Sequence, residues 1–289
     1  MRMASNCYPC ILDRAKFECD LVFSQEEEEK KKAAMEELLG YMACHIGGVP
    51  ALVGTERENI IKRRSGNPDP YQKLKEESNL VARDLLPLAE EFYESADDKI
   101  EALIRIAAAA NSMEFGVKGH DYDNRTFAGV FLDTLNEKLH GDIGEVKRRL
   151  GSFSNIFYLT DNSGEVVFDL FVIGKLLEMG KQVVVGSKSE PVLNDVTVRE
   201  LSALTDMEVE AIPTGNVVGT ALEYLEPEAR ALLLDPAWLI LSKGMGNFET
   251  ISEFEDRLTG RLIYIMRAKC EPVAMVIGVP KGTLVAKSI

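Results

Sequence analysis

The segment 155–165 ends an apolar run in side chains that can bind a metal ion. It reads Asn155-Ile-Phe-Tyr-Leu-Thr-Asp161-Asn162-Ser163-Gly164-Glu165, and a helix-period apolar pattern follows directly. This order predicts a strand, a turn and a helix. In an α/β sheet such a turn lies at the carboxyl end of a strand, where ligands bind. Asp161 and Asn162 would therefore present oxygen ligands at a binding edge.

Polar side chains follow four further short apolar runs in the same way. These presumptive strand ends, at 188–195, 214–216, 243–247 and 267–270, carry carboxylate, amide, glycine and lysine groups. The carboxyl ends of parallel strands meet at one rim of a sheet. The five segments together predict an enzyme that binds a metal ion and a phosphate.

The expected metal ligands are Asp161, Asn162 and Asp195. Carboxylate and amide oxygens suit magnesium, manganese, cobalt or nickel rather than a metal that prefers thiolates. Adjacent residues rarely complete a coordination sphere, and Asp195 follows the next strand along the chain. Three protein oxygens would leave positions open for water and a phosphoryl oxygen, as metal-assisted hydrolysis requires. The alternative for Asp161 is a simple helix N-cap.

Two charged residues near these ligands are expected to take part in catalysis. Glu165 lies in the first turn of the following helix, where it either stabilises the helix dipole or orients a water as general base. Lys269 comes shortly after the apolar strand 262–266, where it would neutralise phosphate charge in the transition state. The alternative for Lys269 is a surface lysine whose stem covers the edge of the sheet.

Glycine-containing turns supply candidate phosphate contacts. Backbone N–H groups at Gly215-Asn216 and at Gly246-Asn247 could approach an anion closely, because glycine leaves the backbone accessible. The second segment begins Lys243-Gly-Met-Gly246 and lacks the Gly-Lys-Ser/Thr ending of a P-loop. We expect Gly215, Asn216, Gly246 and Asn247 to contribute to phosphate binding.

The cysteines and histidines carry no catalytic signal of their own. Cys7 and Cys10 form a CxxC pair that leads into a helical region, so structural thiols are the favoured interpretation. Cys270 lies near the presumed site, but no histidine is placed to activate it. We assign no catalytic role to the three histidines, His45, His120 and His140. An odd count of five cysteines favours a reducing compartment.

Composition limits the classes of partner. The chain of 289 residues has a formal net charge of −14, so binding of nucleic acid through a broad basic surface is not expected. No apolar run is long enough for a membrane helix, and the start of the chain lacks a signal-peptide core. We expect a cytoplasmic protein that acts on a small phosphorylated metabolite. The sequence carries no signal for an oligomeric state.

Periodicity changes near Gly151. Before it, helical patterns cover Ser24 to about Ala43 and the ranges 71–95, 96–111 and 125–139, with a linker-like stretch at 63–70. After it, short β-branched runs at 156–160, 183–186, 209–212, 239–242 and 262–266 alternate with helices. The tail, 273–278 with 283–286, predicts a hairpin or paired edge strands. We therefore expect a helical domain over 1–150 and an α/β domain over 151–289.

These motifs together resemble the damage-control phosphatase (ARMT-like) family, formerly a domain of unknown function, and its stand-alone microbial branch most of all. The matching segments are 161–165, 194–195, 244–249 and 269–270, with 7–10, 69–75 and 110–111 in the first half. The resemblance implies a helical domain beside a Rossmann-like domain with three layers and a mostly parallel sheet. It also implies a divalent metal (Mn²⁺, Co²⁺, Ni²⁺ or Mg²⁺) on Asp161, Asn162 and Asp195.

The same resemblance implies a metal-dependent phosphatase acting on phosphate monoesters of small metabolites, such as sugar phosphates or damaged phospho-metabolites. Asn111 and Lys269 would lie close to the phosphate. Glu114 departs from the pattern, which has aspartate there, and is left out of the metal set. The nucleophile would be a water on the metal or Asp161 itself. Two alternatives are an S-adenosylmethionine-dependent methyltransferase and a non-enzymatic phosphometabolite-binding protein.

Overall fold

The apolar runs beyond residue 151 form one mostly parallel sheet. A computed structural model describes residues 1–112 and 124–289 of the chain. The strands are β1 (Leu139–His140), β2 (Asn155–Leu159), β3 (Gln182–Ser187), β4 (Glu210–Pro213), β5 (Trp238–Lys243), β6 (Leu262–Arg267) and β7 (Leu284–Ser288). Their order in the sheet is β1-β7-β6-β5-β2-β3-β4. Strands β2 to β6 run parallel, and β7 runs antiparallel to β6.

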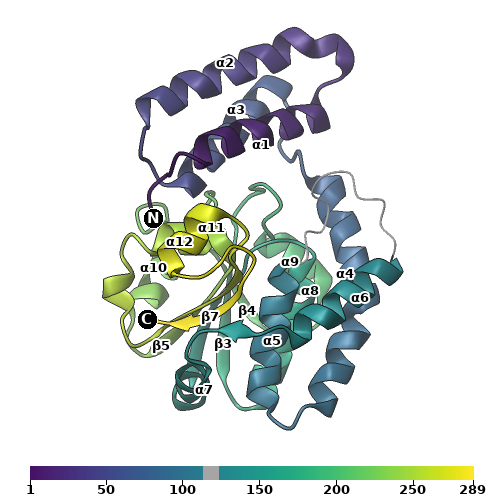
Figure 1. Cartoon of the computed structure of the whole chain (residues 1–289), viewed down its shortest axis with the longest axis vertical. Coiled ribbons are helices and arrows are strands. Elements are labelled where there is room, and N and C mark those ends of the chain that lie inside the picture. The colour runs from purple at the N-terminus through teal and green to yellow at the C-terminus, as the bar shows by residue number, and fades with distance from the viewer. Residues whose placement is uncertain (113–123) are drawn as a thin grey trace.

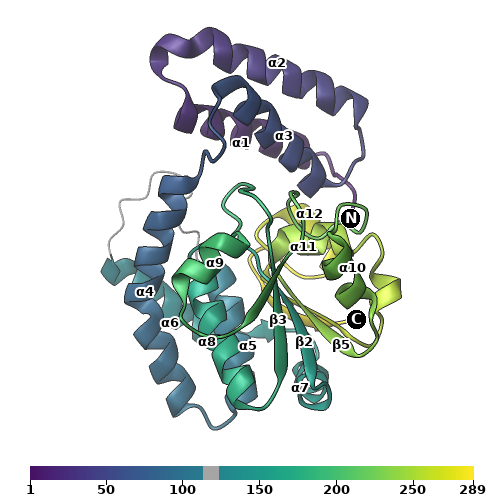
Figure 2. The same ribbon diagram turned by 180° about the vertical axis from the view of Figure 1, so that it is seen from behind.

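Alternate strand residues face two different hydrophobic cores. Ile156 and Tyr158 belong to one core, whereas Phe157 and Leu159 belong to the other. The first core is completed by α4 (Gln72–Ser95), α5 (Lys99–Ser112), α6 (Asn124–Asn136), α7 (Ile143–Ser152), α8 (Glu165–Glu178) and α9 (Val198–Leu204). The second is completed by α10 (Pro227–Leu234), α11 (Gly244–Ile251) and α12 (Glu271–Ile277). Figures 1 and 2 show these helices on the two faces of the sheet, so the expected three-layer Rossmann-like fold is confirmed.

The start of the chain forms a helical bundle beyond the sheet. Its helices are α1 (Cys7–Val22), α2 (Glu28–Cys44) and α3 (Pro50–Ser65), and they bury an apolar core of their own. Ser24 caps a short 3₁₀ turn, Gln25–Glu27, through a reciprocal capping box with Glu27 just before α2. In Figure 1 the bundle is the purple layer above the carboxyl ends of the strands.

The hydrophobic cores do not divide at residue 150, where the two expected domains were to meet. Helices α4 to α7 precede that residue, yet they share a core with the sheet, and Ala107–Ala110 of α5 have no exposed surface. The break between cores falls between α3 and α4. Periodicity reveals that a helix has an apolar face, but it does not identify the element that covers that face.

The predicted hairpin at the end of the chain is wrong in its first half. Glu271–Ile277 form helix α12, with Pro272 in the first turn and Gly278 as a left-handed cap at φ 86°. Proline marks the start of a helix and glycine marks its end, and here these two signals outweigh a short β-branched run. Only 284–288 form a strand, which pairs with β6.

The order of the strands creates a binding crevice next to β2. The chain steps from β2 to β3 and β4 on one side, and then to β5 and β6 on the other. The loops that follow β2 and β5 therefore diverge above the sheet, which is where α/β proteins bind ligands. Within the described residues, no helix is long and apolar enough to cross a membrane.

Candidate functional site

Asp161 lies directly above the carboxyl end of β2 and is fixed by two amides. The Nδ2 atom of Asn111, at the end of α5, donates to Asp161 Oδ2 (3.1 Å) and to Glu165 Oε2 (2.7 Å). Asn162 Nδ2 donates to the same Asp161 oxygen (2.9 Å). The backbone N–H of Arg267 in turn donates to Asn111 Oδ1 (3.0 Å). The Asp161 carboxylate is thus held by groups from α5 and from its own turn.

The structure brings Asp195 beside Asp161 and Asn162. An isolated β-bridge pairs Asn162 with Asp195, and the N–H of Val196 donates to the Asp161 carbonyl oxygen (3.0 Å). A second bond between the loops runs from the Ser163 N–H to the Asn194 carbonyl oxygen (2.8 Å). The three side chains expected to hold a metal are therefore brought together by backbone pairing of two loops.

Gly244 lets the β5–α11 turn approach Asp161. Its φ is +76°, and an added Cβ atom would lie 1.8 Å from Asp161 Oδ2. Any larger residue would displace the Asp161 carboxylate and strain the backbone as well. This glycine makes room for the Asp161 carboxylate.

Replacing Gly244 by alanine should lower kcat/KM by about 10- to 100-fold, since groups that orient catalytic side chains carry effects of that size. Gly260→Ala is the matched control. Its φ is +87°, but nothing lies within 4 Å of an added Cβ, so it carries the backbone strain without the collision. Steady-state kinetics and thermal unfolding of both variants separate the effect of the collision with Asp161 from the effect of backbone strain. Equal activity losses in the two variants would contradict this role for Gly244.

Lys243 is a buried counter-ion beneath the site. Its Nζ atom lies 2.6 Å from Asp169 Oδ1 and 3.8 Å from Glu165 Oε1, and the side chain is fully buried. The Tyr158 hydroxyl also donates to Asp169 Oδ1 (2.6 Å). Burial raises the pKa of Asp169 to about 6, and Lys243 opposes that rise. Sequence reasoning placed Lys243 in a glycine-rich loop and gave it no role.

Buried negative charge accumulates around the expected ligands. Burial, then Glu165 and then Asp195 raise the pKa of Asp161 well above its usual value, while Lys269 and Lys243 oppose the rise. Burial raises the pKa of Asp195 to about 6 against the attraction of Lys188, whose Nζ lies 3.6 Å away. Carboxylates that repel one another in a buried site are stabilised by a bound cation.

The donor set fits a hard divalent cation. Asp161 and Asp195 offer carboxylate oxygens and Asn162 offers an amide oxygen, which are the ligands that magnesium and manganese prefer. The set holds only two carboxylates, and no group of three or more His, Cys, Asp and Glu side chains with a metal-binding arrangement occurs in residues 1–112 and 124–289. A metal here would rely on the amide, on water and on the substrate for its remaining ligands.

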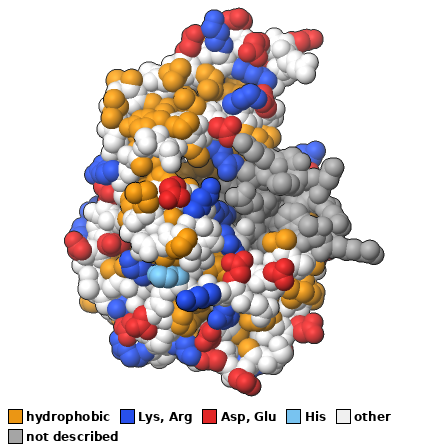
Figure 3. All heavy atoms as spheres, viewed as in Figure 1, with side chains coloured by type: hydrophobic (Ala, Val, Ile, Leu, Met, Phe, Trp, Pro, Cys, Tyr) orange, Lys and Arg blue, Asp and Glu red, His pale blue; other side chains and the backbone are white. Residues whose placement is uncertain are grey.

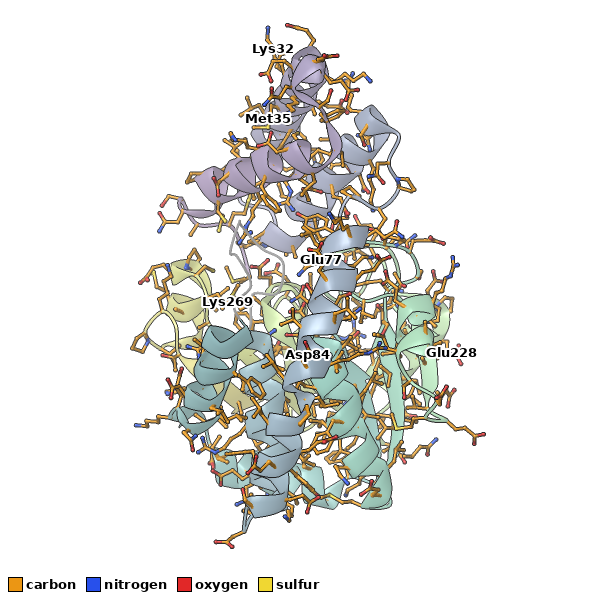
Figure 4. All side chains as sticks on the ribbon, turned by 90° about the vertical axis from the view of Figure 1, so that its right-hand side faces the viewer. Lys32, Met35, Glu77, Asp84, Glu228 and Lys269 are labelled. Atoms are coloured by element: carbon orange, nitrogen blue, oxygen red, sulfur yellow. The ribbon has the colours of Figure 1, made fainter. Side chains whose placement is uncertain are left out.

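A cavity of ≈ 550 Å³ separates this rim from the helical bundle. Several predicted site residues line it from below, namely Asn111, Asp161, Asn162, Asp195, Gly246 and Lys269. The Lys269 ammonium group has no ion pair with any described residue, and its charge acts on Asp161. Figure 4 shows Lys269 below the bundle, and Figure 3 shows basic side chains gathered along the same junction.

Four predicted residues take other positions. Glu165 is buried beside Asn111 and does not line the cavity. Asn247 donates to the carbonyl oxygens of Thr160 (2.9 Å) and Lys243 (2.8 Å), so its amide ties α11 to β2. Gly215 packs against the Tyr224 carbonyl oxygen, and Asn216 is exposed. Local sequence marks such turns as polar but does not show which way they face.

Asn111 reaches the cavity and is also engaged by protein groups. Its amide donates to Asp161 and Glu165, and its oxygen accepts from the Arg267 N–H. The contact with the phosphate that the resemblance implies stays a prediction, and these bonds add a role in positioning the Asp161 carboxylate. Glu114 and His120 lie outside the described residues.

Three thiols line the cavity near α1 and α12, those of Cys7, Cys10 and Cys270. Burial raises the pKa of Cys270 to about 11 and also raises the pKa of Cys7, so both are protonated at neutral pH. The thiolate is the reactive form of cysteine. Raised pKa values make Cys7 and Cys270 less reactive, and the structural role expected for the CxxC pair stays a prediction.

The cavity also has residues that sequence reasoning missed, among them Arg14 and Arg57 of the bundle and Tyr71 at the start of α4. Only Tyr71 carried a signal, because it lies in the segment 69–75 that supported the family resemblance. The two arginines lie on helices, and the pattern of polar residues along a helix does not show whether a polar side chain faces solvent or a cavity.

Comparison with known proteins gives consistent matches over the whole chain. A family model described as the damage-control phosphatase ARMT1-like domain matches residues 3–285. A damage-control phosphatase of Archaeoglobus fulgidus is 30% identical over 294 residues, covering 100% of both chains. An uncharacterised protein of Methanocaldococcus jannaschii is 34% identical over 244 residues, covering 81% of this chain and 78% of its own. The crystal structure of a DUF89 family protein from Pyrococcus horikoshii matches with a TM-score of 0.87 at 27% identity, covering 99% and 98% of the two chains.

Proposed function

Because the chain belongs to the damage-control phosphatase ARMT1-like family, we propose that it is a metal-dependent phosphatase that hydrolyses phosphate monoesters of small metabolites. One observation carries the proposal at the level of chemistry. Asp161, Asn162 and Asp195 meet at the floor of a cavity that is also lined by Lys269, a lysine without an ion pair to any residue the structure describes. Oxygen ligands beside a free cation are the groups that phosphoryl transfer requires.

Asp161, Asn162 and Asp195 would hold the divalent cation, which when bound polarises a phosphoryl oxygen as a Lewis acid. The remaining tasks belong to the chain. Asn111 fixes the Asp161 carboxylate through a hydrogen bond of 3.1 Å. Lys269 places positive charge where negative charge develops on the phosphoryl group.

Ser163 adds a hydroxyl group to this site. Its Oγ atom is buried, has no hydrogen-bond partner in the described part of the chain, and belongs to a residue that lines the cavity. A buried hydroxyl without a partner is costly unless a ligand satisfies it. A phosphoryl oxygen of the substrate would satisfy it once a small movement of the turn opens this atom to the cavity.

The bundle closes the cavity from the other side. Helices α1 and α3 provide its opposite wall, so a bound substrate would contact both the sheet rim and the bundle. A cavity of ≈ 550 Å³ has the size of sites that enclose a whole metabolite rather than a phosphate alone.

Removal of metal is the first test. Protein stripped with a chelator should release no phosphate from p-nitrophenyl phosphate or a panel of sugar phosphates. Manganese, cobalt, nickel or magnesium should restore release, because the oxygen ligands accept all four ions. Folded protein that stays inactive with every metal would contradict the proposal. Saturable binding of S-adenosylmethionine would then favour the methyltransferase, and binding of phosphometabolites without turnover would favour the non-enzymatic alternative.

A further inference from the structure

Arg57 of α3 presents half of its guanidinium group to the cavity. The residue is 5% exposed, and its Nε atom donates to Glu18 Oε2 (2.7 Å), which is itself fully buried. The two terminal nitrogens donate to no described residue and are not among the enclosed polar atoms that lack a partner. Since Arg57 lines the cavity, these nitrogens face into it. Burial of a charged fork with open donors is costly unless a ligand uses them.

Two further donors lie next to this fork. Tyr71, at the start of α4, is 5% exposed and lines the cavity, and Arg14 of α1 lines it as well. Burial and the Glu18 carboxylate raise the pKa of Tyr71, whereas Arg57 and Arg14 oppose this rise, so the four groups share one electrostatic environment. Arg14 has no ion pair in the described part of the chain.

The charged residues that α1 and α3 contribute to the described wall of the cavity are two arginines, Arg14 and Arg57. Arg57 is balanced by Glu18, whereas Arg14 has no ion pair with a described residue. The Glu271 carboxylate comes from α12, and that of Glu249, on α11, accepts a hydrogen bond from the Ala51 backbone at the start of α3. The two arginines therefore favour an anion at their own end of the bundle wall.

This surface lies across the cavity from the phosphoryl site. The rim residues Asp161, Asp195 and Lys269 come from the loops above the sheet, whereas Arg14 and Arg57 come from α1 and α3. A substrate that fills the cavity with its phosphoryl group on the rim would extend its other end towards the arginines. Guanidinium groups bind carboxylates and phosphates in a bidentate manner.

We propose that Arg57, Arg14 and the Tyr71 hydroxyl form a second anion subsite. The preferred substrates then carry, besides the scissile phosphate, a carboxylate or a second phosphoryl group at the other end. The proposal rests on the proposed phosphatase function, since it assigns the substrate class of the same cavity. Glu18 acts as a positioning residue that holds the Arg57 fork.

Matched pairs of substrates test the subsite in the metal-loaded enzyme. The carboxylate pair is 3-phosphoglycerate against glycerol 3-phosphate, and the phosphoryl pair is butane-1,4-diol bisphosphate against its monophosphate. In each pair only the distal group changes. We expect the wild type to prefer the member with the second anionic group in at least one pair by about 10- to 100-fold in kcat/KM, as charge-assisted hydrogen bonds provide. The pair with the larger ratio identifies the group that the subsite takes.

Variants assign the preference to residues. Arg14→Gln and Arg57→Lys should both bring the ratio towards one, because the first removes charge and the second removes the bidentate fork. Arg57→Lys keeps a partner for Glu18, so the buried carboxylate is not left unpaired. Arg63→Gln is the control, since Arg63 lies on the same helix and pairs with Glu37 at the surface. Circular dichroism checks that each variant is folded. If Arg57→Lys does not fold, the Arg14→Gln variant alone tests the subsite.

A wild-type ratio near one, or a ratio unchanged in both variants, overturns the subsite while leaving the phosphatase in place. If no monoester is hydrolysed with any metal, the phosphatase proposal fails, and calorimetric titration tests the subsite alone. Wild type should then bind 3-phosphoglycerate more tightly than glycerol 3-phosphate, and Arg14→Gln should lose this difference. Equal affinities of wild type for the two compounds overturn the subsite.

Discussion

Replacing Asp161 or Asp195 by asparagine should lower metal-dependent kcat/KM on the order of 10³-fold. Asparagine keeps the shape of the side chain but removes the negative charge that would bind the cation. The Asn162–Asp195 bridge is formed by backbone, so neither substitution separates the loops. Loss of activity would thus reflect lost metal binding, which calorimetric titration with manganese measures directly.

Asp161→Asn should also raise the stability of the metal-free protein. Burial and the neighbouring carboxylates raise the pKa of Asp161, so its ionised form opposes folding at neutral pH. A neutral amide at position 161 removes this repulsion. Thermal unfolding with a chelator should therefore show a higher Tm for Asp161→Asn than for wild type, and manganese should narrow or reverse the difference.

Asp256→Asn serves as the control, because Asp256 is an exposed carboxylate on the turn after α11. It should leave both activity and Tm unchanged. Full activity in Asp161→Asn and Asp195→Asn would remove these residues from the metal site. Reduced activity with unchanged manganese affinity would instead assign them a role outside metal binding.

Replacing Lys243 by methionine should lower the free energy of unfolding by about 3–5 kcal/mol, the usual cost of leaving a buried charge without its partner. Asp169 and Glu165 would lose the ammonium group that lies 2.6 Å and 3.8 Å from their oxygens. Urea unfolding measures the change. Lys32→Met, at an exposed residue that Figure 4 shows at the top of the bundle, should have little effect.

Two further measurements tie the effect to charge. Adding Asp169→Asn to Lys243→Met should recover part of the loss, because the double variant no longer buries an unpaired Asp169 carboxylate. The defect of the single variant should also shrink from pH 8 towards pH 5. Burial already raises the pKa of Asp169 to about 6, and removal of Lys243 raises it further, so acid neutralises the carboxyl group in the folded state. A defect independent of both pH and Asp169 would indicate lost packing instead.

The sequence carried most of the architecture because each strand is a short apolar run that ends in polar residues. Asp161 and Asp195 could be paired in advance for the same reason, since both follow strands whose carboxyl ends share a rim. The prediction failed where a short run was compatible with both a strand and a helix. The run 273–278 was interpreted as a strand, although Pro272 and Gly278 already indicated a helix start and end.

Side-chain direction was the larger obstacle at the site. Asn247 and Asn216 both follow strands as expected, yet Asn247 lies in helix α11 with its side chain buried, whereas Asn216 is exposed to solvent. Arg57 is the reverse case, a helix residue with no motif that the packing of the bundle turns towards the cavity. Such outcomes depend on how whole elements dock, which no local pattern encodes.

The order of the elements along the chain also determines when the parts of the site become available during synthesis. The bundle residues leave the ribosome first and bury a core of their own. The side chain of Asn111, in contrast, accepts a hydrogen bond from the Arg267 N–H, which is synthesised 156 positions later. Domains fold as units while the ribosome extends the chain. A nascent chain that stops short of β6 therefore holds a finished bundle but an unanchored Asn111 and no Lys269. The groups expected to bind the metal and the phosphate are therefore complete only after Lys269 has been made, long after the bundle side of the cavity.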